Sequence, residues 1–144
     1  METIRPWLHI GRYRDTLNQS LLTANRIGAM LQLAEHVQHP QIATLYLPIE
    51  DGVPLAGELL QQGLSFVHAA HQQGQAVLIA CGAGISRSAT FAIAALKEVE
   101  GLSLLEATKA VKYHHPAAMP HPALWESLCA YYHEPVPYLV IVRL

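Results

Sequence analysis

One short segment of the chain combines a cysteine, two glycines and an arginine in an order that suits anion chemistry. The segment is Cys81-Gly82-Ala83-Gly84-Ile85-Ser86-Arg87-Ser88. Glycines let a backbone turn sharply and approach a ligand closely. The guanidinium of Arg87 offers a planar fork of donors that matches two oxygens of a phosphate group. We therefore predict that residues 82–87 form a cradle of phosphate size.

Cys81 begins this cradle, and its thiol is the candidate nucleophile. The backbone N–H groups and helix dipole that attract a phosphate also stabilise a thiolate. A thiolate that faces a bound phosphoryl group is placed for in-line attack. Ser88 can donate its hydroxyl to the sulfur, and the alternative is that it is only a first-turn hydroxyl of the next helix.

The elements that must position the cradle are a strand before it, the apolar run 76–80, and a buried helix after it, from residue 88. Such a turn, from a strand's carboxyl end into a helix, is where α/β folds bind ligands. Ser103 and Glu106 have the spacing of a capping box for a later helix. The other predicted strands are 7–10 (an edge strand), 27–33 and 43–49, and the other predicted helices are 20–25, 55–73, 103–113 and 122–132. This alternation indicates one α/β domain, residues 1–144, with a largely parallel central sheet and helices on both faces.

Composition excludes several classes of protein. The chain has 144 residues, 51% of them hydrophobic and 14% charged, which is typical of a globular domain. A net charge of -2 with no basic run argues against a nucleic-acid partner. No apolar run approaches the ~20 residues that cross a bilayer, and residues 1–9 do not resemble a signal peptide. We expect no membrane partner and a cytoplasmic location, where a free thiol stays reduced.

Two features of the chain leave alternatives open. Its two cysteines, Cys81 and Cys129, are too few for a disulfide scaffold, although one bridge between them stays open, and Cys129 is more simply a buried apolar residue. The tail 135–144 contains a β-prone run, Tyr138–Val142. We favour an added edge strand or a packed extension of the domain for it over a contact that forms a homodimer.

The pattern Cys-x-x-Gly-x-Ser-Arg-Ser, followed by Ala89-Thr90, closely resembles the phosphate-binding loop of the dual-specificity phosphatases, within the Cys-x5-Arg protein tyrosine phosphatase superfamily. Residues 7–11 are similar to the opening strand of that family, and residues 46–51 to the segment with its general acid. Leu104, Glu106, Ala107 and Val111 are similar to a later helix. The resemblance covers roughly residues 5–133 and leaves 134–144 as an extension.

The resemblance implies that Asp51 is the general acid, because the family places this residue about thirty positions before the cysteine, on a mobile loop. Glu50 is the nearby competitor, and a turn-capping role is the other interpretation of Asp51. The implied reaction forms a phosphocysteine at Cys81 and needs no metal or cofactor. Phosphate, sulfate or vanadate is expected in the loop. The substrate implied is a protein carrying phosphotyrosine, with phosphoserine or phosphothreonine as further targets.

Two positions depart from the family pattern. Ala80 stands where most members have a histidine that helps to form the thiolate, and Pro120-His121-Pro122 replaces a Pro-Asn segment that supports the loop. A phosphate-reading pseudophosphatase is therefore the alternative to an active enzyme. The rival substrates are lipids or other non-protein phosphomonoesters, which the absence of a basic residue at positions 82–86 disfavours.

Overall fold

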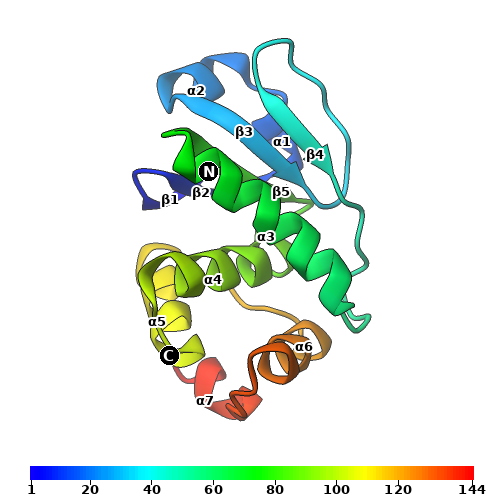
Figure 1. Ribbon diagram of the computed structural model, residues 1–144, viewed down its shortest axis with the longest axis vertical. Coiled ribbons are helices and arrows are strands. Elements are labelled where there is room, and N and C mark those ends of the chain that lie inside the picture. Colours follow the sequence, from blue (N-terminus) through cyan, green and yellow to red (C-terminus); the bar gives the residue numbers. More distant parts are fainter.

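The central sheet of the protein contains five strands in the order β1-β2-β5-β3-β4 (Figure 1). The computed structural model describes all of residues 1–144. The strands are β1 (Glu2–Arg5), β2 (Leu8–Arg12), β3 (Ile27–Gln32), β4 (Ala43–Tyr46) and β5 (Ala76–Cys81). All neighbouring strands pair in parallel except β1, which is antiparallel to β2. The predicted, largely parallel sheet is confirmed.

The strand predicted at residues 7–10 is present as β2, but its predicted position at the edge of the sheet is wrong. Residues 2–5 form the true edge strand, with Glu2 opposite Ile10, and they enclose β2 between β1 and β5. The segment Glu2–Arg5 has a single apolar residue, Ile4, which is buried. Its sequence therefore lacks the alternating apolar pattern that predicts a strand. Pairing with β2, a tertiary interaction, makes this segment a strand.

Helices cover the two faces of the sheet unequally. Alternate side chains of β5 point to opposite faces, and they enter buried clusters of very different size. Val77, Ile79 and Cys81 belong to a core of 28 buried residues, which α3 to α7 help to form. Leu78 and Ala80 point into a separate cluster of 5 buried residues near α2. The helices are α1 (Tyr13–Thr16), α2 (Gln19–Ala24), α3 (Gly57–Gln72), α4 (Arg87–Glu100), α5 (Leu104–His114), α6 (Pro122–Tyr132) and α7 (Tyr138–Val142). Helices on both faces were expected, and the fold agrees.

Helix α4 lies at the centre of the larger core, between the sheet and the outer helices (Figure 1). Its residues from Ser88 to Leu96 are all buried, which confirms the buried helix predicted after the cradle. At Gly63 of α3 an added Cβ would lie 2.4 Å from the Phe91 ring, so this glycine allows α3 to pack closely on α4. Close packing around α4 fixes the position of its first turn, where the cradle ends.

The predictions for the helix at Ser103 and for the tail have different outcomes. The capping box of α5 is present, with Ser103 Oγ accepting from the Glu106 N–H and the Glu106 carboxylate accepting from the Ser103 N–H. The tail, in contrast, contains helix α7 and no strand. Pro137 caps α7, and Ile141 is fully buried in the larger core beside α6. The β propensity of this run is overridden because the tail lies in the helical layer, away from either edge of the sheet. The packed extension is therefore the correct alternative.

Candidate active site

The cradle lies where β5 ends at Cys81 and α4 begins at Arg87. Strand β5 is central, with β2 and β3 parallel on its two sides, so the loop 82–86 lies at the carboxyl edge of the parallel part of the sheet. Ligand sites of α/β proteins occupy this edge. Cys81 is buried, while Gly82 and Ala83 are exposed. A ligand can therefore reach the thiol only from the open side of the loop.

The backbone of the loop turns its carbonyls toward the protein and leaves its amides free. The carbonyl of Gly82 accepts from the Tyr13 N–H, at 3.4 Å, and that of Ile85 accepts from the Met119 N–H, at 2.9 Å. No backbone N–H group of residues 82–86 donates to a protein acceptor. Free amides that converge on one point at a helix N-terminus form an anion site. This arrangement is compatible with the predicted phosphate-sized cradle, whose binding of an anion stays a prediction.

Gly84 requires glycine for two reasons. Its φ is +71°, in the left-handed region, and an added Cβ would lie 3.0 Å from the carbonyl oxygen of Gly11 at the end of β2. Its own carbonyl oxygen lies 2.7 Å from Nε2 of His115, a buried histidine that follows α5. The loop is therefore held in shape by β2 on one side and by His115 on the other.

The thiol of Cys81 lies 3.2 Å from the hydroxyl oxygen of Ser88, and both groups are buried. In the neutral pair the thiol donates this hydrogen bond. In the thiolate the Ser88 hydroxyl becomes the donor, because a charged sulfur accepts strongly. The first turn of α4 thus places the Ser88 hydroxyl beside the sulfur, and its donation to a thiolate stays a prediction.

Arg87 links the cradle to the segment that carries the candidate acid. Its Nη1 donates to the carbonyl of Ile49, at 3.1 Å, and an added Cβ on Gly82 would lie 3.4 Å from Nη2. The guanidinium therefore extends back along the loop toward Gly82. It remains half-buried, so its other N–H groups are available to an anion.

Asp51 lies against the loop, through a contact that the sequence did not suggest. The hydroxyl of Ser86 donates to Oδ1 of Asp51, at 2.5 Å, and accepts from the backbone N–H of His121, at 2.8 Å. Glu50, the competitor, instead lines a pocket of about 150 Å³ with Pro54 and Leu59, among other residues. The predicted residues Cys81, Arg87 and Asp51 therefore meet around one loop.

Sequence reasoning missed two functions of residues around the loop. Ser86 was predicted only as part of the cradle, whereas its side chain also bridges Asp51 and His121. His115 had no recognisable spacing signal, because its contact with Gly84 joins positions 31 apart. His121 contacts the loop through its backbone, while its ring caps α6 by accepting from the Ala123 N–H.

Ala80, which stands in place of the family histidine, is surrounded by apolar side chains. Its side chain is buried in the smaller cluster with Leu22, Ile27, Met30 and Leu78. No imidazole extends from this position, so the loop amides, the dipole of α4 and Ser88 are the groups near the sulfur.

Residues 8–134 match the family model described as Dual specificity phosphatase, catalytic domain. The chain belongs to this family. Among its dual-specificity relatives, human dual specificity protein phosphatase 16 is 34% identical over 82% of this chain. Mouse dual specificity protein phosphatase 15 is 30% identical over 89% of it. The matches cover only 18% and 56% of the length of these two relatives.

Solved structures of dual-specificity phosphatases superpose closely on this chain. The crystal structure of human DUSP28 has a TM-score of 0.86 at 28% identity, over 92% of this chain and 96% of the other. That of DUSP15 has a TM-score of 0.83 at 26% identity, over 99% and 92%. The α/β architecture described above is thus the fold of the family.

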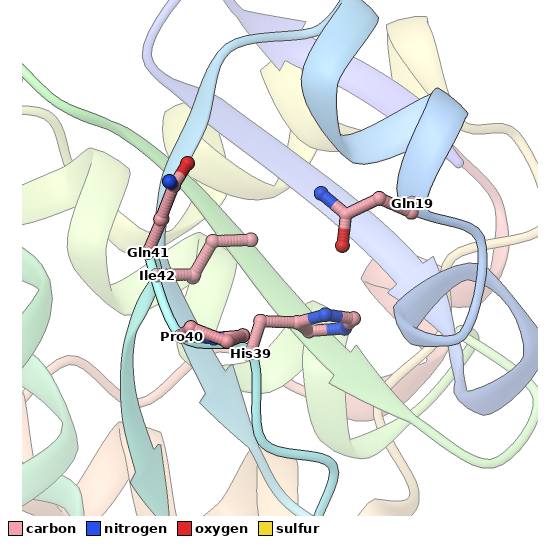
Figure 2. Close-up of a pocket in the computed structure, with 5 residues that line it drawn as sticks. All are labelled: Gln19, His39, Pro40, Gln41 and Ile42. Carbon is pink, nitrogen blue, oxygen red and sulfur yellow. The ribbon is translucent and has the colours of Figure 1, made fainter.

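The remaining features of the structure lie outside the cradle. A pocket of about 250 Å³ lies beside the first residue of α2 and the loop before β4, where Figure 2 shows the ring of His39 and the amide of Gln19 facing the same space. Its lining residues include no thiol and no carboxylate.

Both cysteines are free, and burial raises the pKa of the Cys129 thiol on α6. None of the helices combines the length and the apolar composition that a membrane-spanning segment requires.

Proposed function

We propose that this protein is a phosphoprotein phosphatase that hydrolyses phosphotyrosine, and also phosphoserine and phosphothreonine, through a phosphocysteine intermediate at Cys81. The observation that carries the proposal is the set of unbonded amides at residues 82–86, which starts at a buried thiol and ends at an arginine. Such a site binds a dianionic phosphoryl group and presents it to sulfur. A mouse relative whose crystal structure has a TM-score of 0.86 was crystallised as a complex with zinc tungstate, and tungstate is a tetrahedral oxyanion like phosphate.

In the first step the Cys81 thiolate attacks phosphorus, so that an S–P bond forms while the P–O bond to the substrate breaks. The equatorial oxygens are stabilised by the loop amides and by Arg87. The leaving oxygen takes its proton from Asp51. Since Oδ1 of Asp51 accepts from Ser86, Oδ2 is the oxygen that carries this proton.

In the second step water attacks the phosphocysteine, the S–P bond breaks and inorganic phosphate forms. Asp51, now a carboxylate, accepts the proton of the attacking water. The departing sulfur regains its negative charge, and the Ser88 hydroxyl, 3.2 Å away in the free protein, supports it by donating a hydrogen bond.

The alternative function, a pseudophosphatase that binds phosphoproteins without turnover, is favoured by one observation. Ala80 supplies no imidazole to help form the thiolate. The hydrogen bond between Ser86 and Asp51 favours the enzyme, because a binding protein gains nothing from an acid beside the phosphate site. The loop has no basic side chain at 82–86, so a protein phosphomonoester is a better match than a polyphosphorylated lipid.

The deciding experiment measures hydrolysis of an aryl phosphate against pH, with reductant and without added metal, for the wild type, Cys81→Ser and Asp51→Asn. We expect Cys81→Ser to abolish turnover. Asp51→Asn should lower the rate by about 10²- to 10⁴-fold and weaken its alkaline fall, because a general acid contributes about that much. Turnover that persists in Cys81→Ser would contradict the mechanism, and no turnover in the wild type would favour the pseudophosphatase. Parallel assays with phosphotyrosine peptide, phosphoserine peptide and phosphoinositide identify the substrate class.

A further inference from the structure

The C-terminal segment 134–144 is anchored next to the residues that hold the candidate acid. Helix α7 lies beside α6 in the lower, helical part of the molecule (Figure 1). Three contacts anchor it. The indole N–H of Trp125 donates to the carbonyl of Val136 at 2.8 Å, Ile141 is fully buried, and the hydroxyl of Tyr138 donates to the carbonyl of Pro120 at 2.6 Å.

The Tyr138 contact begins a continuous path to the acid. Pro120 is joined by a peptide bond to His121, whose N–H donates to the Ser86 hydroxyl at 2.8 Å. The same hydroxyl donates to Asp51 Oδ1 at 2.5 Å. The path from α7 to the carboxylate therefore consists of hydrogen bonds and one covalent link. Any displacement of the Pro120–His121 segment would shift the donor that holds Asp51.

Tyr138 and Asp51 also interact electrostatically. The pKa of Tyr138 is raised, first by burial of the phenol and then by the negative charge of Asp51. A raised pKa keeps the phenol protonated through the neutral range. Its hydroxyl therefore remains a donor to Pro120 at neutral pH.

We propose that Tyr138 is a positioning residue for Asp51, which acts by holding the Pro120–His121 segment in place. The inference rests on the proposed function, because it concerns proton transfer by Asp51. Helix α7 begins at residue 138, after the end of the family match at residue 134. The extension thus supplies from outside the matched region a support for the acid inside it.

Positioning of an acid has a chemical signature that a general loss of structure lacks. A leaving phenol with a pKa near that of tyrosine, about 10, needs a proton in the transition state. A strongly acidic nitrophenol leaves readily as an anion and needs much less help. Loss of acid positioning should therefore slow the first substrate and spare the second.

The experiment compares Tyr138→Phe with the wild type on phenyl phosphate and on 2,4-dinitrophenyl phosphate. Tyr132→Phe is the matched control, because it also removes a donating phenol, one that bonds to Glu98. We expect kcat/KM of Tyr138→Phe, which reports formation of the phosphocysteine, to fall about 5- to 10-fold on phenyl phosphate and less than about 2-fold on the dinitrophenyl ester, within the range that misplaced groups cost. Tyr132→Phe should slow both esters equally or not at all.

A double mutant completes the test. In an Asp51→Asn background, Tyr138→Phe should cause no further loss on phenyl phosphate, because the group that it positions has already been removed. Equal losses on both esters, no loss on either, or an additive loss in the double mutant would overturn the role of Tyr138 and leave the proposed function intact. A wild type with no Cys81-dependent turnover of either ester would instead overturn the proposed function, and this inference with it.

Discussion

The hydroxyl of Ser86 lies 2.5 Å from Oδ1 of Asp51 and connects the candidate acid to the loop that would hold the phosphate. A hydroxyl has a single proton to donate. Because the His121 N–H already donates to the Ser86 oxygen, the Ser86 proton is free to point toward the carboxylate. The direction of this bond is thus set by the backbone of a distant segment.

Removal of this hydroxyl should impair proton transfer. We expect Ser86→Ala to lower kcat for phenyl phosphate by about 10-fold, an order typical of a misplaced catalytic group. Ser86→Thr keeps the hydroxyl and should retain most of the rate. Steady-state kinetics of both variants check this, and equal rates for alanine and threonine would contradict it.

An alanine at position 84 should damage the cradle. The φ of +71° costs about 1–2 kcal/mol for a residue with a Cβ, and the contact with the Gly11 carbonyl adds to it. Gly101→Ala is the matched control, because its φ is +67° and an added Cβ there meets no atom within 4 Å. We expect both variants to melt earlier and only Gly84→Ala to lose inhibition by vanadate. Equal vanadate inhibition in the two would contradict this explanation.

Restoration of the family histidine should harm the fold. Ala80 is 3% exposed among four buried apolar side chains, so the larger side chain of Ala80→His would crowd this cluster. Overpacking costs about 1–3 kcal/mol. We expect a lower melting temperature and no gain in turnover, with Ala80→Ser as the small polar control. A faster, equally stable variant would contradict this prediction.

We predict that Glu134 contributes to the free energy of unfolding in a pH-dependent way. Its pKa is lowered by Lys97, 2.6 Å away, and by the Leu104 N–H at the start of α5. Because the pKa in the folded state is depressed, the contribution is present above the unfolded value, about 4.3, and is lost as the pH falls through the folded value. We expect Glu134→Gln to cost about 1 kcal/mol at pH 7 and much less in acid, where the carboxylate is protonated.

The control for this prediction is Glu126→Gln, which removes an exposed carboxylate with no ion-pair partner. Chemical denaturation of both variants across the acid range measures the difference. A cost for Glu134→Gln that does not change with pH would show that the ion pair contributes no stability.

Local patterns in the sequence were sufficient for the loop and for the capped helix at Ser103, because each depends on residues close in the chain. The resemblance supplied Asp51. Contacts between distant segments were not predictable, such as that of His115 with Gly84 or the antiparallel pairing of β1. The strand prediction for the tail was wrong for a related reason. Its β-branched residues favour a strand, but burial of Ile141 beside α6 determines the outcome.

The carbonyls of the loop are held by Tyr13, His115 and Met119, donors from separate parts of the chain. The cradle is therefore formed before any ligand arrives, and a tetrahedral dianion loses little free energy in ordering it. In the proposed cycle, the inorganic phosphate released at the end meets the same amides as the substrate. We therefore expect product inhibition, so that a phosphate buffer would mask the activity of this protein.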